Sequence, residues 1–309
     1  MNILVTGGAG FIGSHIVDLL VKENKVIIID NLSSGQKENI NKKAIFYEQD
    51  LSNFKEVEDI IKKENIEIIY HLAAQMDVRK SVELPIFDAQ QNIINTLNLL
   101  EVSIKYKIKH FIFSSSGGAI YGDTNVPTTE EARELPVSPY GVAKLSIEKY
   151  LNYYHKIHNL KYTALRYANV YGSRQNQKGE AGVVSIFFTR MLRNEPISIF
   201  GGKQTRDFVF VEDVARANLL ALTDKESNTY NIGTEKETNI IELFNEINKF
   251  FNNKFSPIYE KSKLGEQMKS CLSYQKISKQ LNWQPKINLE EGLKKTYEFY
   301  KFLKDSNNS

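Results

Sequence analysis

The sequence contains few of the residues that indicate a disulfide-bonded, membrane-spanning or nucleic-acid-binding protein. Cys271 is the only cysteine among 309 residues, which excludes an intrachain disulfide and favours a small buried apolar role for this side chain. No apolar run approaches the roughly 20 residues of a membrane-spanning helix. The net charge is only +3, and the lysines alternate with acids and asparagines. We therefore expect a soluble, cytoplasmic protein without a nucleic-acid or membrane partner.

The remaining composition is that of an ordinary globular enzyme. Hydrophobic residues make up 41% of the chain and charged residues 25%, and the length allows two lobes. The few histidines share no spacing typical of zinc ligands, so we expect no metal; they are His15, His71, His110, His155 and His158.

A glycine-rich turn follows the first apolar run of the chain. Residues 3–5 are typical of a buried strand, Gly7, Gly10 and Gly13 interrupt the pattern, and a helical period begins at Phe11. The first N–H groups of such a helix have no partner and lie at its positive end, which suits a pyrophosphate. The spacing is Gly-x-x-Gly-x-x-Gly, so the strand and helix around the glycines, rather than the glycines alone, predict dinucleotide binding.

The second apolar run, residues 26–29, ends in an acid, Asp30. A carboxylate at this interval from the glycine turn suits the adenosine ribose hydroxyls and would repel a 2′-phosphate. The sequence therefore favours NAD over NADP. The alternative is an acid that caps the turn at the end of its own strand.

Strand and helix patterns alternate through the first half of the chain and become less regular after Arg166. This rhythm predicts an α/β fold, with a doubly wound parallel sheet and a smaller mixed α/β domain. We assign 1–168 to the dinucleotide-binding domain, with 212–235 returning to it, and 169–309 mainly to the second domain. Long helices are predicted from Pro85 to about Tyr106 and from Pro139 onward. We expect the core to include Trp283 and the C-terminal aromatic residues Tyr297, Phe299, Tyr300 and Phe302.

A tyrosine, a lysine and a serine supply the candidate chemistry. Tyr140 and Lys144 are four residues apart in a predicted helix, so both lie on one face. The ordinary pKa of tyrosine is about 10, and a nearby ammonium lowers it, so Tyr140 could accept a proton while hydride leaves the same carbon. Such pairs are common on helix surfaces, but Ser115 and Ser116 end a predicted strand at the edge where ligands bind. We prefer Ser116 as proton relay and leave Ser115 open.

These motifs together resemble the extended short-chain dehydrogenase/reductases, and within them the NAD-dependent nucleotide-sugar epimerases, above all the UDP-glucose 4-epimerase family. The resemblance extends over nearly the whole chain. It is carried by residues 5–13, 71–75, 113–116, 121–122, 140–144, 165–172, 205–209, 265–266 and 281–285.

The resemblance implies a role for individual residues. The cofactor NAD would contact the glycine turn, the ends of three strands and the tyrosine–lysine pair, that is, Gly7, Gly10, Phe11, Ile12, Gly13, Asp30, Asn31, Asp50, Leu51, Ala73, Ala74, Tyr140 and Lys144. The UDP-sugar would contact Ser116, Asn169, Arg206, Lys263, Glu266 and Ser270. Without the motif, Arg206 beside Asp207 would be interpreted as a surface ion pair.

Two positions bear on the substrate. Lys263 stands where many relatives carry arginine, and lysine meets a phosphate as a point charge without the bidentate fork. Ser270 aligns with a position where relatives restricted to plain hexoses can carry a bulky aromatic residue. A serine there would leave room for an N-acetyl group, unless Ser270 simply faces solvent.

The activity implied is the interconversion of UDP-glucose and UDP-galactose, and of the N-acetylated pair, by transient oxidation at the sugar C4. A UDP-glucuronate decarboxylase or another NAD-dependent nucleotide-sugar oxidoreductase is the alternative, and a noncatalytic dinucleotide sensor is a remote one. The resemblance also implies a homodimer whose seam includes Leu97, Leu100 and Ile104.

Overall fold

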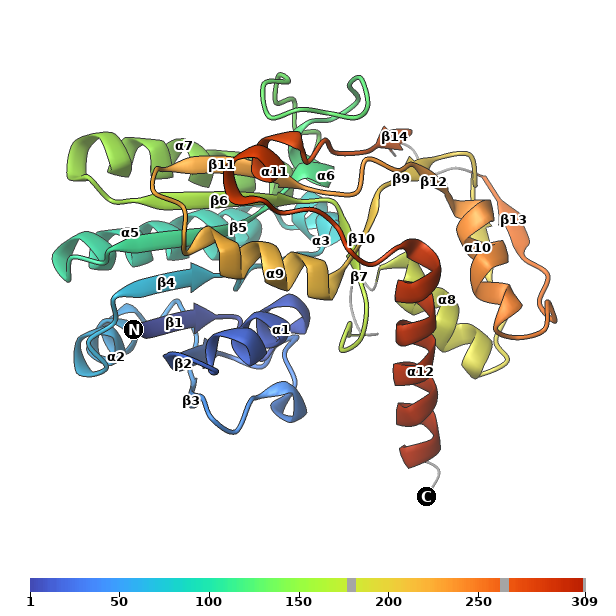
Figure 1. The fold of residues 1–309 in the computed structure, drawn as a ribbon, viewed down its shortest axis with the longest axis horizontal. Coiled ribbons are helices and arrows are strands. Elements are labelled where there is room, and N and C mark those ends of the chain that lie inside the picture. Colours follow the sequence, from blue (N-terminus) through green and yellow to red (C-terminus); the bar gives the residue numbers. More distant parts are fainter. Residues whose placement is uncertain (177–181, 262–266, 308–309) are drawn as a thin grey trace.

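A seven-stranded sheet forms the larger part of the molecule (Figure 1). The computed structural model describes residues 1–176, 182–261 and 267–307. The strands lie in the order β11-β6-β5-β4-β1-β2-β3, and each neighbouring pair is parallel. They are β1 (Asn2–Thr6), β2 (Lys25–Asp30), β3 (Ile45–Glu48), β4 (Ile68–His71), β5 (His110–Ser116), β6 (Tyr162–Tyr167) and β11 (Asn228–Ile232). This confirms the predicted doubly wound sheet.

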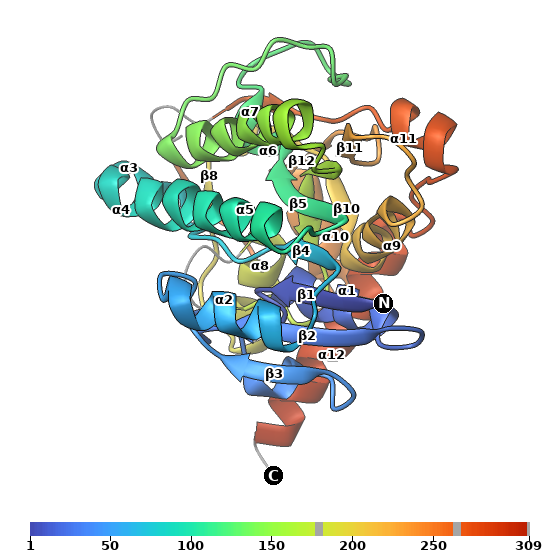
Figure 2. The same ribbon diagram turned by 90° about the vertical axis from the view of Figure 1, so that its left-hand side faces the viewer.

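Helices cover both faces of this sheet (Figure 2). Successive residues of β1 show why: Ile3 and Val5 enter the core under α1 and α9, whereas Leu4 enters the core under α2, α5 and α7. Strands buried on both sides need apolar residues throughout, which explains their continuous apolar runs. The covering helices are α1 (Phe11–Leu20), α2 (Phe54–Lys63), α5 (Asn95–Lys105), α7 (Pro139–His158) and α9 (Val211–Ala221).

The helix predicted from Pro85 is present but changes its hydrogen-bonding pattern along its length. It begins as α4 (Pro85–Ala89), continues as a π-helical segment over Gln90–Ile94, and ends as α5. Such π segments are rare and frequently occur near functional sites. A short helix, α3 (Val78–Glu83), precedes it, and α3, α4 and α5 all contact α7.

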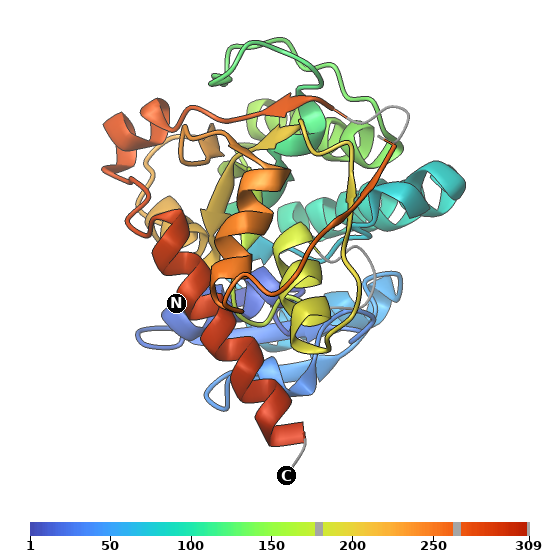
Figure 3. The same ribbon diagram turned by 90° about the vertical axis from the view of Figure 1, so that its right-hand side faces the viewer.

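Helices of the second lobe pack against one another (Figure 3), and aromatic side chains fill the space between them. Phe187 and Phe188 of α8, Phe244 of α10 and Tyr300 of α12 meet there. Its elements are β7 (Asn169–Tyr171), α8 (Val183–Leu192), β8 (Ser198–Phe200), β9 (Thr205–Arg206), β10 (Phe208–Phe210), β12 (Thr238–Asn239), α10 (Ile240–Lys249), β13 (Ile258–Glu260), β14 (Lys269–Ser270) and α12 (Leu289–Asn307). The short helix α11 (Gln275–Leu281) packs instead against β11 of the large sheet. A 3-10 turn (Lys37–Asn39) and α6 (Gly117–Ile120) complete the described elements.

The buried positions agree with most of the expected core. Cys271 and Trp283 are buried, and burial raises the pKa of the Cys271 thiol to about 12, as expected for an inert apolar role. Phe302 was expected in the core but is 68% exposed, because it lies in the last turns of α12, which extend beyond the lobe (Figure 1). Among the described residues, no helix is both long and apolar enough to cross a bilayer.

The glycine turn lets α1 pack directly onto the end of β1. Gly7 has a φ of +71°, and a Cβ there would lie 2.7 Å from the backbone nitrogen of Ala73. A Cβ on Gly13 would overlap the carbonyl oxygen of Gly7. The glycines therefore bring three backbone segments closer together than side chains would allow.

Gly13→Ala should destabilise the fold by about 1–3 kcal/mol or more, because the new methyl group meets backbone atoms that cannot move independently. Denaturant unfolding of the purified protein measures this. Gly118→Ala is the matched control, since the nearest heavy atom to its new Cβ is 4.0 Å away. Equal stability losses in the two variants would contradict this packing account.

Candidate active site

The predicted site residues gather at one edge of the sheet. Because all seven strands are parallel, their carboxyl ends meet there, and ligands bind at this edge in open α/β sheets. Asp30, His71 and Ser116 end β2, β4 and β5. The segments that carry Asp50, Leu51, Ala73 and Ala74 follow β3 and β4 directly.

The backbone N–H groups in the first turn of α1 donate to no capping side chain of the described residues, and so remain available to a ligand. Gly10 is the N-cap residue, is extended, and has no side chain to accept a hydrogen bond. The first intrahelical bond runs from the Ser14 N–H to the Gly10 carbonyl. The N–H groups of Phe11, Ile12 and Gly13 therefore precede the helical ladder, and this turn fits the pyrophosphate of a dinucleotide.

Asp30 is largely buried beside this turn. Its carboxylate accepts hydrogen bonds from the Ala9 N–H at 3.0 Å and from the Leu32 N–H at 2.8 Å. Burial raises its pKa, and the two N–H donors oppose that rise. The hydrogen bond to Leu32 shows that Asp30 does cap the turn at the end of its own strand, which was the alternative to a role in binding the ribose. The Asp30 carboxylate nevertheless lies at the carboxyl edge of the sheet. Asn31 donates to Asp50 at 2.6 Å, which joins the ends of β2 and β3.

Lys144 is buried, with 4% of its surface exposed. Its ammonium donates to the Ser114 carbonyl oxygen at 2.8 Å and lies 4.8 Å from the centroid of the Phe113 ring. Burial lowers its pKa to about 8, while the charges of Asp88 and Glu148 oppose that fall. An ammonium in this position can therefore change its protonation state near neutral pH.

Tyr140 lies within range of this ammonium, 5.7 Å from Lys144 Nζ to the ring centroid. Pro139 begins α7, Ser138 caps it by accepting from the Gly141 N–H, and the Tyr140 N–H donates to Ser81 Oγ at 3.2 Å. Gly141 allows a close approach, because a Cβ there would overlap the Ala119 carbonyl oxygen. The first turn of α7 is thus fixed against α3 and α6.

The two candidate serines have different surroundings. Ser115 is buried and its hydroxyl donates to Glu148 at 2.6 Å. Ser116 is half-buried, precedes α6 as its N-cap residue, and its hydroxyl has no hydrogen-bond partner among the described residues. The geometry therefore ties Ser115 to the protein interior and leaves Ser116 available.

A buried ion pair that the sequence reasoning missed explains the role of Ser115. Arg166 of β6 is 3% exposed and binds Glu148 of α7 through both Nε and Nη2. It also donates to Tyr121 Oη at 2.7 Å and to Glu134 at 2.9 Å. Burial alone would lower the pKa of Arg166, but the hydrogen bonds and charge of Glu148 raise it. The pair joins the sheet, α7 and the loop after Tyr121.

The substrate-side residues gather around a second buried acid, Asp207. Its carboxylate accepts from the Thr234 N–H and hydroxyl and from the Leu272 N–H. Its backbone oxygen accepts from the Asn169 N–H. Burial raises the pKa of Asp207 to about 6, against these donors. Asp207 is fully buried, so the surface ion pair considered for it is wrong.

Arg206 and Ser270 lie opposite each other in the register of β9 and β14. Ser270 is 4% exposed, which excludes the alternative that it faces solvent. Two residues later, Leu272 occupies the space beside Gly117, where a Cβ would overlap its side chain. The Ser270 segment therefore contacts the turn that follows Ser116. Lys263 and Glu266 lie outside the described residues.

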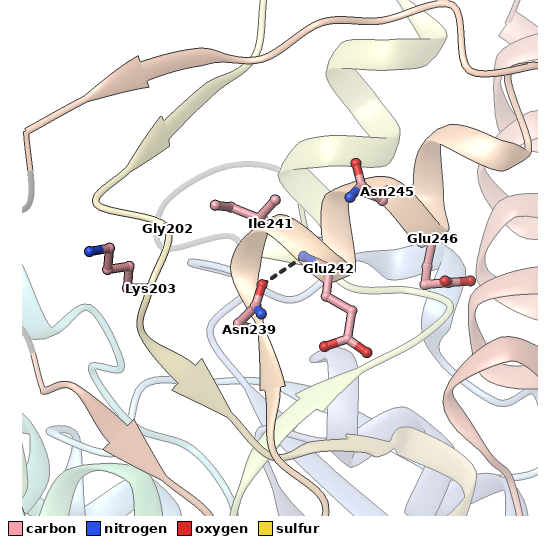
Figure 4. A pocket seen from close by; sticks show the side chains of 7 residues that line it. All are labelled: Gly202, Lys203, Asn239, Ile241, Glu242, Asn245 and Glu246. Carbon is pink, nitrogen blue, oxygen red and sulfur yellow. Dashed lines mark hydrogen bonds between the residues drawn. The ribbon is translucent and has the colours of Figure 1, made fainter.

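A surface hollow of about 440 Å³ lies between the Gly202 turn and α10 (Figure 4). Asn239 caps α10 there by accepting from the Glu242 N–H at 2.7 Å. Its lining is Gly202, Lys203, Asn239, Ile241, Glu242, Asn245 and Glu246. None of these belongs to the predicted site. Among the described residues, no cluster of three or more His, Cys, Asp or Glu side chains could hold a metal ion.

The chain is similar to three solved structures over nearly its whole length. A UDP-glucose 4-epimerase of Thermotoga maritima with UDP-glucose is 51% identical, with a TM-score of 0.96 and coverage of 98% of this chain and 99% of that one. A UDP-glucose 4-epimerase of Thermus thermophilus with NAD is 38% identical, with a TM-score of 0.91 and coverage of 97% and 99%. A UDP-N-acetylglucosamine 4-epimerase of Methanobrevibacter ruminantium is 36% identical, with a TM-score of 0.93 and 98% coverage of both.

A family model adds to these likenesses. Residues 3–233 match the model of the NAD dependent epimerase/dehydratase family. Together with the similar structures, this match confirms the resemblance drawn from the motifs, the prediction of an NAD-dependent enzyme of the nucleotide-sugar 4-epimerase type, and NAD as cofactor. With more than half of its length matched by that model, the chain belongs to the NAD-dependent epimerase/dehydratase family.

Proposed function

We propose that this enzyme is a UDP-glucose 4-epimerase that interconverts UDP-glucose and UDP-galactose. The observation that carries the proposal is the buried Lys144 ammonium beside Tyr140, at the sheet edge where Ser116 also lies. The likeness to UDP-glucose 4-epimerases supports the same reaction.

Each proposed catalytic residue has one task. Tyr140 accepts the proton of the sugar 4-hydroxyl, because the Lys144 ammonium stabilises its phenolate. Ser116 hydrogen-bonds the reacting oxygen and relays the proton. NAD supplies reversible hydride acceptance at C4 when bound. The same residues then return the proton after the sugar has turned about its bond to the diphosphate, so that the opposite epimer forms.

The proposed binding regions follow the two lobes. We assign NAD to 1–168 together with 212–235, where Gly7–Gly13, Asp30, Asn31, Asp50, Leu51, Ala73 and Ala74 border the sheet edge; β11 and α9 pack with this sheet. We assign the UDP-sugar mainly to 169–309, where Asn169 and Arg206 would hold the diphosphate. The guanidinium of Arg206 suits a phosphate because it can donate two parallel hydrogen bonds.

Tyr140→Phe and Ser116→Ala should each lower kcat by about 10²-fold or more, because both remove a proton-transfer group. NMR of the purified protein with UDP-glucose, without added NAD, follows the appearance of UDP-galactose. Ser115→Ala is the matched control: it should mainly lower stability, since Ser115 contacts Glu148 rather than the site.

Separate reactions with UDP-N-acetylglucosamine and UDP-glucuronate complete this test. Loss of carbon dioxide from UDP-glucuronate, with no epimer from UDP-glucose, would establish the decarboxylase alternative. An inactive Ser115→Ala variant with unchanged stability, together with an active Ser116→Ala variant, would reverse the assignment of the serines.

We also propose that the enzyme accepts N-acetylated UDP-hexoses. Ser270 is small, buried, and two residues from Leu272, which touches the turn after Ser116. Space at this position would admit the acetamido group at C2. The likeness to a UDP-N-acetylglucosamine 4-epimerase supports the proposal.

Ser270→Tyr should abolish turnover of UDP-N-acetylglucosamine and spare UDP-glucose, because the phenol ring would fill the acetamido space. The ratio of kcat/KM for the two sugars measures this. Lys269→Tyr is the control, since residue 269 is exposed in the same strand. Equal losses on both sugars, or on neither, would exclude Ser270 as the selective position.

We propose in addition a homodimer. Its interface would be formed by the outer face of the continuous helix that runs from α4 to α5, together with the outer face of α7. Ile86, Ile94, Tyr153 and Ile157 are exposed there by 86, 42, 50 and 62%. The residues first considered for this seam fit less well: Leu100 is fully buried, and Leu97 and Ile104 pack against the same core. The helical spacing of these three residues correctly identified an apolar face of α5, but this face packs into the core beside the sheet.

Tyr153→Glu should convert a dimer into a monomer, because it introduces a charge into an apolar interface. Size-exclusion chromatography with light scattering measures the mass. Tyr259→Glu, at a residue that is 62% exposed on β13, is the control and should leave the mass unchanged. A wild-type protein of single-chain mass would refute the proposed dimer.

A further inference from the structure

A buried acid, Asp88, lies on α4, which packs against the helix that carries Tyr140 and Lys144. Asp88 is 1% exposed. Its Oδ1 accepts from Gln75 Nε2 and from Asn92 Nδ2, both at 2.9 Å. Its Oδ2 is buried and has no hydrogen-bond partner among the described residues. A buried carboxylate with half of its acceptor capacity unused is costly and requires an explanation.

The first consequence of this arrangement concerns the segment after β4. Asn92, in the π-helical segment, accepts from the Gln75 N–H and donates to the Gln75 carbonyl, both at 2.8 Å. The Gln75 side chain in turn spans the Asp77 backbone, donating to its carbonyl and accepting from its N–H. Asp88 holds the Gln75 and Asn92 side chains together, and so fixes the segment that begins at Ala73.

The same chain of contacts reaches Tyr140. Asp77 caps α3 by accepting from the Lys80 N–H. Ser81 of α3 is fully buried and its Oγ accepts from the Tyr140 N–H at 3.2 Å. The position of the Tyr140 backbone therefore depends on α3, whose start the Asp88–Gln75 contact holds in place.

The second consequence is electrostatic. The charged or titratable groups near Lys144 come from three elements: Asp88 of α4, Glu148 and Tyr140 of α7, and His71 of β4. His71 is neutral, since burial and the nearby Lys144 lower its pKa to about 3, and it bonds Thr6 and Thr96. Glu148 is paired with Arg166. Asp88 is thus the acid near Lys144 that no cation pairs within the described residues.

We propose that Asp88 is a positioning residue of the epimerase, which holds the Gln75–Asp77 turn under Tyr140 and supplies the negative charge that keeps Lys144 in its ammonium form. The role rests on the proposed function of the tyrosine–lysine pair. It also gives the buried carboxylate a use, since its charge acts on Lys144 although its Oδ2 has no donor among the described residues.

Asp88→Asn tests the charge while preserving the shape. Its side-chain oxygen can still accept from Gln75 and Asn92, while the charge is lost and an amide NH₂ group takes the place of Oδ2. Without that charge Lys144 should lose its proton at lower pH. The alkaline limb of the plot of kcat against pH should therefore shift to lower pH. We expect the ratio of kcat at pH 8.5 to kcat at pH 6.5 to fall roughly fivefold or more relative to wild type.

Asp224→Asn is the matched control, because Asp224 is also buried but bonds Tyr230 at the base of β11. It should leave the profile unchanged. Asn92→Ala loosens the Gln75 turn but keeps the Asp88 charge, and should lower kcat at all pH values without moving the limb. Circular dichroism and the NAD content of the purified proteins establish folding; Asp88→Ser is the second neutral variant if the asparagine variant does not fold.

A direct titration separates this inference from the proposed reaction. In protein with ¹⁵N-labelled lysine side chains, the signal absent from Lys144→Arg identifies Lys144, and its midpoint in Asp88→Asn should lie below that of wild type. An unchanged midpoint and pH profile in both neutral variants would overturn the role of Asp88. A shifted midpoint in a protein that epimerises none of the UDP-sugars would leave Asp88 established and refute the proposed function alone.

Discussion

Keeping an ammonium group inside the protein is the constraint around which the site is built. Burying Lys144 removes its hydration, a loss that only nearby acceptors and negative charge can offset. The Ser114 carbonyl, the face of Phe113 and the charge of Asp88 provide these. They belong to β5 and α4, whereas Lys144 belongs to α7. The three elements must therefore keep fixed relative positions for the lysine to remain charged.

Two buried acids on neighbouring helices, Glu148 of α7 and Asp88 of α4, have different electrostatic partners. Glu148 lies one helical turn beyond Lys144 but is held by Arg166, so its charge is largely committed to the pair. Asp88 receives only amide donors. An acid bonded only to amides acts on a nearby ammonium more strongly than an acid whose charge a guanidinium partly offsets, and both acids raise the pKa of Lys144, Asp88 more than Glu148. The Arg166–Glu148 pair thus anchors α7, and Asp88 acts on the lysine that α7 carries.

The sequence was informative where the chemistry is local. Apolar runs and the glycine turn predicted the parallel sheet and the packing of α1, and the four-residue spacing predicted the Tyr140–Lys144 face. It was silent on Asp88 and Arg166, because a buried charge has no sequence signature when its partners lie on other elements. Phe302 and Leu100 were misplaced for a related reason: a helical period shows that a face is apolar, not which surface covers it. The alternation of side chains along a strand, by contrast, could have shown that Ser115 and Ser116 point to opposite faces of the sheet.

Epimerisation places two conflicting requirements on the residues around the sugar. In the proposed reaction, proton transfer needs a fixed distance between Tyr140 and the reacting oxygen, whereas a sugar that presents both faces in turn needs free volume. In this chain the first requirement falls on the start of α7, where contacts to Ser81 and Ala119 leave little freedom. Gly118 differs, since a methyl group there would meet nothing nearer than Asn169 Oδ1 at 4.0 Å. Rigid contacts and open space thus alternate within α6, because Ala119 packs against Gly141 and Gly117 packs against Leu272, while Gly118 between them is open.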